Sequence, residues 1–223
     1  MFREKINQTV ASIGEMTEIA HKLRVQFFKK NFREEANINK KIIDIGCGGG
    51  EYTNILRKKG FDVIGCDILE DSIKFAKKKY PKCNFIKANV DNLPFDKNYS
   101  DIILCLGIFE YMNRTEVDIA LKEIKRVLKI DGMIILMMLS NTSIFYRLGL
   151  QKKTGKKNEG NRFNYYNERL RLLKSGYTDV KIRNIYIFPK PFIFLTKFFY
   201  LLEKINVKLN FLSHVMYIEA RKK

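Results

Sequence analysis

The sequence predicts an α/β fold in which a parallel sheet is covered by helices on both faces. Strand-like apolar runs alternate with amphipathic helical segments from residue 41 to residue 139, an alternation that is typical of βαβ units. The first run, residues 41–46, ends in a glycine cluster, as a buried strand does when it turns tightly into a helix. With 223 residues, of which 46% are hydrophobic, the chain is long enough for one sizeable core and at most an added lid.

Each element of this region has its own local signal. The helix after the glycine cluster is expected to end at Lys58-Lys59-Gly60, a cationic last turn followed by a glycine stop. Residues 115–129 repeat apolar residues at helical spacing. We expect strands at 41–46, 61–67, 84–88, 100–106, 133–139 and 214–222, a sixth strand starting at 176–180, and helices at 50–59, 70–79, 115–129 and 165–175.

Three further segments lie outside this regular alternation. Residues 1–40 are expected to form an N-terminal helical cap that precedes the domain at 41–223. Residues 140–163 change in character and are expected to form a lid or insert. An apolar helix is expected at 191–209, where Lys197 interrupts a run too short to span a membrane. Two interpretations of this helix stay open, packing on the domain or lying in a membrane interface.

The charge and the cysteines limit the partners and the compartment. A net charge of +18 is typical of proteins that bind nucleic acid, an anionic membrane or an acidic substrate, although biased lysine usage is the favoured explanation of it. The four cysteines have neither zinc nor disulfide spacing, which favours a reducing compartment. Because the N-terminus has no apolar signal core, we expect a cytoplasmic protein, with peripheral contact at the inner membrane face as an option. Lysines cluster at Lys74, Lys77, Lys78 and Lys79, and again at Lys152, Lys153, Lys156 and Lys157.

The glycine cluster indicates a ligand site at the end of the first strand. Glycines remove Cβ atoms where a ligand lies against the backbone, and the next helix points its N–H groups at that ligand. Glu51 stands where the dinucleotide fingerprint needs its third glycine, and the Gly-Lys-Ser/Thr of a phosphate loop is absent. Asp67 ends the second strand 21 residues after Gly46, the place at which a carboxylate accepts hydrogen bonds from ribose hydroxyls. The alternatives are a plain strand-to-helix turn and an aspartate that caps the next helix.

The pattern Asp-x-Gly-x-Gly-x-Gly at 44–50 resembles motif I of the class I methyltransferases that depend on S-adenosylmethionine (SAM). Residues 89–95 are similar to the stretch Asp-Ala-Glu-x-Leu-Pro-Phe of the small-molecule branch that includes quinone-biosynthesis enzymes, with Asn89 in place of the first acid. The resemblance implies a Rossmann-like, seven-stranded, mostly parallel sheet in the order 3-2-1-4-5-7-6. It also implies SAM as cofactor and S-adenosylhomocysteine as product. The cofactor-binding positions that it implies are Asp44, Gly46, Cys47, Gly48, Asp67, Ile68, Asn89, Val90 and Leu106.

The implied reaction is in-line displacement of a methyl group from the sulfonium to a small-molecule, sugar or lipid-like acceptor. The reaction needs mostly alignment and exclusion of water, so the sequence identifies no catalytic base, and it predicts no metal. The residues expected to face the acceptor are His21, Glu110, Tyr111 and Tyr165.

Two alternative functions remain, an RNA methyltransferase and a SAM-binding protein that transfers nothing. RNA is the weaker choice of acceptor, because the Asn/Asp-Pro-Pro-Tyr motif of amino-group methylases and the Pro-Cys nucleophile of cytosine C5 enzymes are both absent. The sequence makes no prediction of oligomeric state.

Overall fold

The computed structural model of the chain describes residues 15–32, 40–141, 163–185 and 215–223. The apolar helix expected at 191–209 lies wholly outside these residues. The lid expected at 140–163 lies outside them except at 140–141 and 163. None of the helices in the described part of the chain is long and apolar enough to cross a bilayer.

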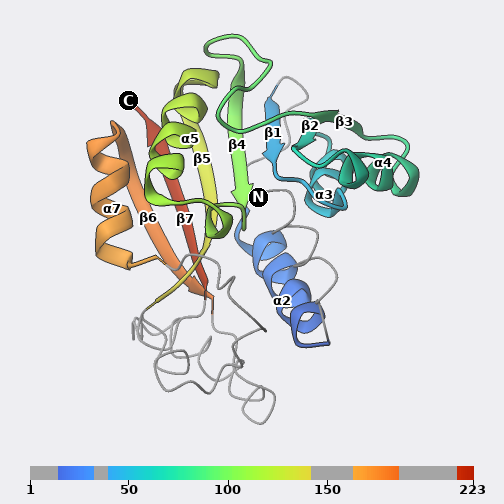
Figure 1. The fold of residues 1–223 in the computed structure, drawn as a ribbon, viewed down its shortest axis with the longest axis horizontal. Coiled ribbons are helices and arrows are strands. Elements are labelled where there is room, and N and C mark those ends of the chain that lie inside the picture. The colour runs from blue at the N-terminus through green and yellow to red at the C-terminus, as the bar shows by residue number, and fades with distance from the viewer. Residues whose placement is uncertain (1–14, 33–39, 142–162, 186–214) are drawn as a thin grey trace.

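A single sheet of seven strands runs through the molecule in the order β3-β2-β1-β4-β5-β7-β6, which confirms the expected topology (Figure 1). The pairs from β3 to β5 are parallel, and β7 runs antiparallel to both β5 and β6. The strands are β1 (Lys41–Ile45), β2 (Asp62–Asp67), β3 (Asn84–Lys87), β4 (Ser100–Leu106), β5 (Leu128–Leu139), β6 (Tyr177–Ile185) and β7 (Val215–Lys222).

Helices cover both faces of this sheet, as expected. They are α2 (Glu15–Asn31), α3 (Glu51–Lys58), α4 (Glu70–Lys79), the short 3-10 helix η1 (Phe109–Tyr111), α5 (Arg114–Val127) and α7 (Tyr165–Lys174). α2 and α3 pack on one face, α5 and α7 pack on the other, and α4 packs on β2 and β3 (Figure 1).

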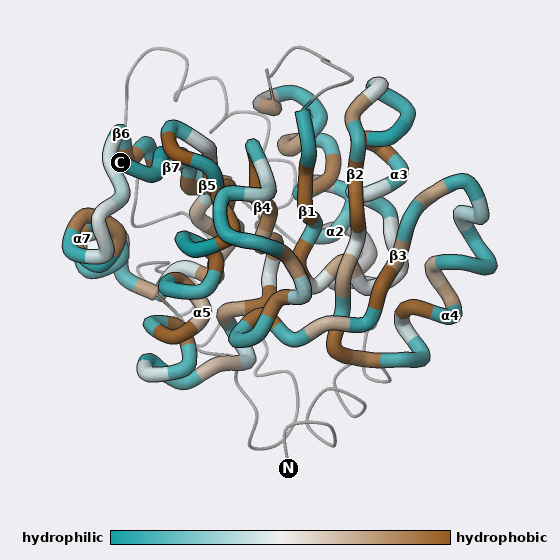
Figure 2. The backbone as a smooth tube through the Cα atoms, turned by 90° about the horizontal axis from the view of Figure 1, so that it is seen from above, coloured by the Kyte–Doolittle hydropathy of each residue, from teal (hydrophilic) through white to brown (hydrophobic). Residues whose placement is uncertain are grey.

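The strands are hydrophobic on both sides because both faces are covered. Along β5, Ile134 and Leu136 enter the apolar cluster beneath α5, and Ile135 and Met137 enter the cluster beneath α2. Figure 2 shows the same arrangement as hydrophobic strands inside a more hydrophilic shell. In α2, Phe28 is fully buried in the cluster that also contains residues of β1, β4 and β5, so this helix shares the core of the sheet.

The start of β5 differs from the expectation. The helix predicted to reach residue 129 ends at Val127, and the strand predicted from 133 begins at Leu128. Leu128 pairs with Ser100, and a register shift follows before Ile102 pairs with Met133. Asp131, at φ 60°, makes the local turn within the strand, a left-handed conformation that a helical pattern does not reveal.

Candidate cofactor site

The predicted cofactor residues meet at one edge of the sheet. β1, β2 and β4 are parallel neighbours, so the residues that follow them lie side by side at the carboxyl ends of the strands. The glycine turn follows β1, Asp67 ends β2, and Leu106 ends β4. Sheets of this kind bind ligands at the point where the strand order reverses, which here lies between β1 and β4.

The three alternate glycines of the turn have different roles. Gly46, Gly48 and Gly50 all adopt left-handed conformations, at φ 70°, 50° and 77°. A Cβ on Gly46 would lie 2.0 Å from Ile108 Cγ2, and one on Gly50 would lie 2.6 Å from the Phe85 ring, whereas one on Gly48 would meet nothing within 4 Å. Packing therefore requires two of the glycines, and the third leaves the backbone open to a ligand.

Asp67 is held beside this open backbone. Its Oδ2 accepts a hydrogen bond from the Gly48 N–H at 2.9 Å, and its Oδ1 accepts one from the Leu69 N–H at 2.9 Å. A carboxylate has about four lone-pair positions, so both oxygens can still accept hydrogen bonds from a ligand. Ile68 is half-buried next to it. This arrangement fits the ribose of SAM, with the carboxylate oriented by the same turn that the ligand would contact.

Asp44 lies behind the turn, buried in the protein. It is 1% exposed, and its Oδ2 accepts a hydrogen bond from Thr53 Oγ1 at 2.6 Å. Burial raises the pKa of Asp44 to about 7, and the negative charge of Asp67 adds to the increase. The hydrogen bonds from Thr53 act in the opposite direction and lower the pKa. Cys47 is also buried, and the pKa of its thiol is raised by that burial. Asp44 therefore supports the turn from inside. The sequence motif alone cannot tell this structural role from direct contact with the ligand.

The segment after β3 provides the third side of the site. The Ala88 N–H donates to the Asp67 carbonyl at 3.0 Å, and the Asn92 N–H donates to the Asn89 carbonyl at 3.1 Å. The Asn89 side chain is exposed and Val90 is buried. These bonds place the backbone at 89–90 next to the end of β2, as an adenine-reading segment requires.

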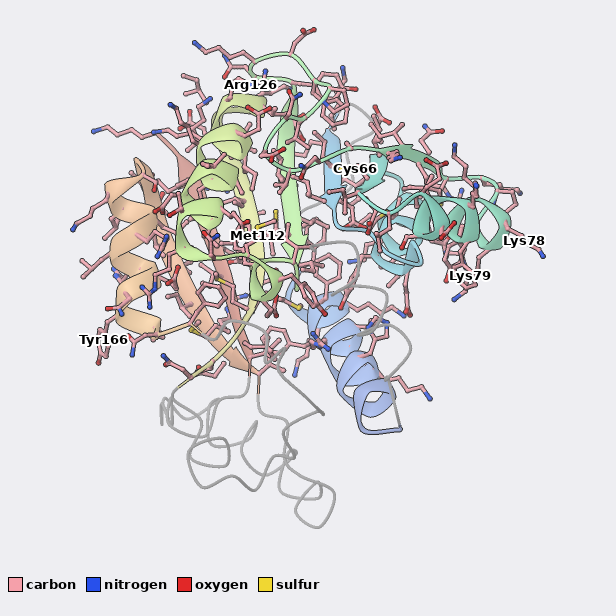
Figure 3. The ribbon with its side chains drawn as sticks, in the orientation of Figure 1. Cys66, Lys78, Lys79, Met112, Arg126 and Tyr166 are labelled. Atoms are coloured by element: carbon pink, nitrogen blue, oxygen red, sulfur yellow. The ribbon has the colours of Figure 1, made fainter. Side chains whose placement is uncertain are left out.

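An arginine that sequence reasoning missed anchors the stretch that follows. The Arg126 guanidinium donates to the Phe95 carbonyl at 2.8 Å and to the Leu93 carbonyl at 3.1 Å, and it pairs with Glu123 at 2.7 Å (Figure 3). In a helical pattern it reads as an ordinary cation in the last turn of α5.

Comparison with known proteins agrees with the resemblance to methyltransferases that the sequence motifs indicate. Residues 43–136 match a family described as a methyltransferase domain. The matched segment is therefore similar to a methyltransferase domain, and it runs from β1 into β5. The ubiquinone biosynthesis O-methyltransferase of Rickettsia conorii is 30% identical over 139 residues, which are 60% of this chain and 46% of that protein. The chain spans about half the length of the curated relatives it matches.

Solved structures share the fold of this chain. A SAM-dependent methyltransferase from Archaeoglobus fulgidus superposes with a TM-score of 0.69 at 21% identity, covering 90% of this chain and 94% of that one. A structure from Methanosarcina mazei, also described as a SAM-dependent methyltransferase, gives a TM-score of 0.62 at 17% identity, with 87% and 96% covered.

The helix α2 brings two polar side chains, His21 and Arg24, to the carboxyl edge of the sheet. His21 Nε2 lies 2.6 Å from Glu51 Oε2, at the start of α3 directly after the glycine turn. Arg24 Nη1 lies 3.7 Å from the point where a Cβ on Gly107 would stand, just beyond β4. Arg24, Glu51 and Gly107 are not among the residues that the sequence predicted for the site. The spacing of His21 and Arg24, about one helical turn apart on α2, could have pointed to Arg24 alone.

Two of the predicted acceptor residues join this group. Glu110 is 5% exposed, and its Oε1 lies 3.8 Å from the same Cβ position on Gly107 that Arg24 approaches. Tyr111 is 42% exposed. The pKa of its phenol is raised by burial and by the charge of Glu110, and Arg24 acts in the opposite direction. His21 reaches the group through the turn, so α2, the glycine turn and η1 meet at the end of β4.

Leu106 and Tyr165, which were also predicted for the site, have other neighbours. Leu106 pairs with Met137 in the last register position between β4 and β5. Tyr165 lies in the first turn of α7, packs against the apolar cluster beneath α5 and α7, and has its ring 5.4 Å from that of Tyr166. In the described part of the chain, no cluster of three acidic, histidine or cysteine side chains is arranged to hold a metal ion.

Proposed function

We propose that the chain binds SAM across the carboxyl ends of β1, β2 and β4 and transfers its methyl group to a small organic acceptor. The observation that carries this proposal is the position of Asp67, whose carboxylate is oriented by the Gly48 N–H next to open backbone. A ribose with two hydroxyls matches this combination of acceptor oxygens and close backbone approach.

Each side of the site has a part in holding this cofactor. Asp67 would accept the hydrogen bonds of the ribose hydroxyls, and Ile68 would lie against the purine. Asn89 and the Val90 N–H would read the adenine edge, and the backbone at Leu106 would lie near the methionine portion. When bound, SAM supplies a methyl group that is already activated by a positively charged sulfur.

The chain therefore needs to provide alignment and a dry site more than proton transfer. The leaving group of the displacement is neutral, so correct orientation of the acceptor and exclusion of water lower most of the barrier. A general base is required only where the acceptor carries a proton of high pKa. Glu110 lies beside Gly107, just beyond β4, and Tyr111 follows it in η1, so we assign both to binding and shaping the acceptor.

The acceptor that we propose is a lipid-like, quinone-related ring. The support is the similarity to relatives named for ubiquinone biosynthesis and the Leu-Pro-Phe stretch that resembles the same branch. Because the chain spans only part of those relatives, their substrate comes to this chain as a proposal.

The test is methyl transfer from methyl-labelled SAM to a panel of catechol and hydroxyquinone acceptors. We expect labelled organic product together with S-adenosylhomocysteine, lost in Asp67→Ala and retained in Asp62→Ala, which removes an exposed aspartate from the start of the same strand. Label recovered in RNA would favour the RNA alternative. SAM binding without turnover on any cell-extract fraction would favour a protein that only binds SAM.

A further inference from the structure

The helix α4 has an outward face on which lysines surround an exposed aromatic ring. Lys74, Phe75, Lys78 and Lys79, which we call the α4 patch, are all exposed, and Phe75 is 55% exposed. The opposite face of α4 buries Ile73 and Ala76. Figure 3 shows Lys78 and Lys79 projecting outward from α4 at the edge of the molecule.

The ring of Phe75 is held in place at the surface. Its Cε1 lies 3.3 Å from the point where a Cβ on Gly49 would stand, so one edge of the ring touches the glycine turn. The ammonium of Lys79 lies over the ring, 5.6 Å from its centroid. Single exposed hydrophobic residues are common and need no explanation. Phe75 differs from them because its ring is held in place and is surrounded by cations, as in an interaction site.

The positive charge of the α4 patch is largely uncompensated. Across the described residues, the ion pairs involve none of its three lysines. Glu70, in the first turn of α4, pairs with Lys87 of β3 at 3.4 Å. Asp71 is the one other acidic residue of the helix, and Lys77 adds a further cation. The patch therefore attracts an anionic surface.

We propose that the α4 patch docks the protein on a bilayer that contains anionic phospholipids. Lysine is suited to this partner, because its long apolar stem lies along the interface while the ammonium reaches the headgroups. An exposed aromatic ring between lysines is typical of segments that bury their apolar face at the acyl boundary.

The same geometry argues against RNA as the partner. Base stacking needs an open face on the aromatic ring, and Phe75 offers less of its ring because Lys79 lies over one face and Gly49 packs against one edge. Binding of a nucleic-acid strand uses several aromatic side chains on which successive bases stack, and Phe75 is the single aromatic residue of α4.

Docking at this place would bring the cofactor edge close to the bilayer. Phe75 touches the turn at Gly49, so the patch lies directly beside the turn that would receive the cofactor. An acceptor with an apolar tail could then reach the site from the membrane. The docking itself does not depend on methyl transfer and is tested separately from it.

The experiment measures binding of the full chain to phosphatidylglycerol–phosphatidylcholine vesicles by flotation, with pure phosphatidylcholine vesicles as the uncharged reference. We expect binding to the mixed vesicles only, weakening as salt is added. Changing Lys74, Lys78 and Lys79 together to Gln should weaken the partition by about fivefold for each lysine, roughly a hundredfold in all. Phe75→Ala should weaken it further by about tenfold.

A matched control removes the same charge elsewhere. Lys122, Lys174 and Lys181 are exposed on α5, α7 and β6, and changing all three to Gln should leave more than half of the binding free energy intact. SAM binding and circular dichroism of both triple variants verify that they fold. Equal losses in the two triple variants would overturn the proposal in favour of diffuse net charge, and so would an absence of vesicle binding by the wild type. Vesicle binding that is unaffected by the α4 changes would also overturn it. So would binding of RNA that depends on the α4 patch, in a protein that does not bind vesicles.

Discussion

Asp44 shows how a single buried carboxyl group couples the cofactor turn to pH. Its side chain is sealed behind the turn with Thr53 as its hydrogen-bond donor, and burial raises its pKa to about 7 from an ordinary value of 3.8. The folded chain therefore holds this proton up to about pH 7, whereas the unfolded chain releases it near pH 4. Between these values the folded state binds more protons, so this group's contribution to stability falls as pH rises.

Replacing Asp44 by Asn should remove this pH dependence. We expect the free energy of unfolding of the wild type to fall by a few kcal/mol, at most about 1.4 kcal/mol for each unit of pKa shift, between about pH 4 and pH 7. Asp44→Asn should have a flatter profile and be the more stable of the two at alkaline pH. Urea unfolding across the pH range measures this, with Asp62→Asn as an exposed control. A slope that is unchanged in Asp44→Asn would contradict the assignment.

The glycines of the turn allow a second test at the same scale. Gly46→Ala would place a methyl group 2.0 Å from Ile108 Cγ2, at a residue whose φ is left-handed. A left-handed conformation alone costs a residue with a Cβ about 1–2 kcal/mol. Because the clash adds to this cost, we expect Gly46→Ala to lower the free energy of unfolding by more than that amount. Gly48→Ala carries only that conformational cost, since its Cβ enters open space. If the open space is the ligand site, Gly48→Ala should lose SAM affinity out of proportion to its stability. Parallel urea unfolding and calorimetry compare the two, and normal SAM affinity in Gly48→Ala would place the ligand elsewhere.

At this scale the sequence predicts residues that share a local pattern and misses those that meet only through packing. Asp67 and the glycines lie at fixed spacings within one βαβ unit, which is why they could be predicted. Arg24 and Glu51 lie on two helices that meet across the site, and a charged residue on a helix face carries no local sign of its partner. Arg126 was missed for the same reason.

At the scale of elements, α2 is tied to the cofactor turn at one end and to the core at the other. Phe28 packs edge to face on Tyr52 of α3, with ring centroids 5.1 Å apart. About two turns earlier on α2, His21 bonds Glu51 at the first position of α3. The helix thus has a fixed position relative to the turn that precedes α3.

Breaking the link between His21 and Glu51 should affect cofactor binding more than folding. Both side chains are about 40% exposed, and exposed pairs contribute only about 0–1 kcal/mol to stability. We expect His21→Ala to leave the urea midpoint nearly unchanged while SAM affinity falls several-fold, because α2 loses its contact with the turn. Gln26→Ala, an exposed change on the same helix, is the control. Equal SAM affinity in His21→Ala and the control would show that the contact plays no part in binding.

The boundary between α5 and β5 shows where element prediction fails. Leu128 continues the apolar helical pattern of α5, yet it pairs with Ser100 across the sheet. Lys129, predicted to be helical, instead binds the Asp101 carboxylate at 2.9 Å. That ion pair, together with the hydrogen bond from the Lys41 N–H, holds the pKa of Asp101 below its ordinary value even though burial acts to raise it. Long-range pairing therefore overrides the local helical preference.

At the scale of the molecule, the fold was predictable because local alternation and a family resemblance agreed. The alternation from 41 to 139 predicts the parallel part of the sheet from first principles. The insertion of β7 between β5 and β6 is a tertiary arrangement, and only the resemblance implied it.

Net charge is also a property of the whole molecule, and a value of +18 does not identify which surface is functional. Only the placement of Phe75 among the lysines of α4 separates one patch from a general lysine excess.

The most direct test of the central claim is calorimetric titration of SAM into the wild type, Asp67→Ala and Asp62→Ala. The account predicts micromolar binding by the wild type and by Asp62→Ala. Asp67→Ala should bind about ten- to a hundredfold more weakly, the range expected for losing hydrogen bonds to a charged group. Equal affinity in all three proteins, or no binding by the wild type, would contradict a SAM site at the carboxyl ends of β1, β2 and β4.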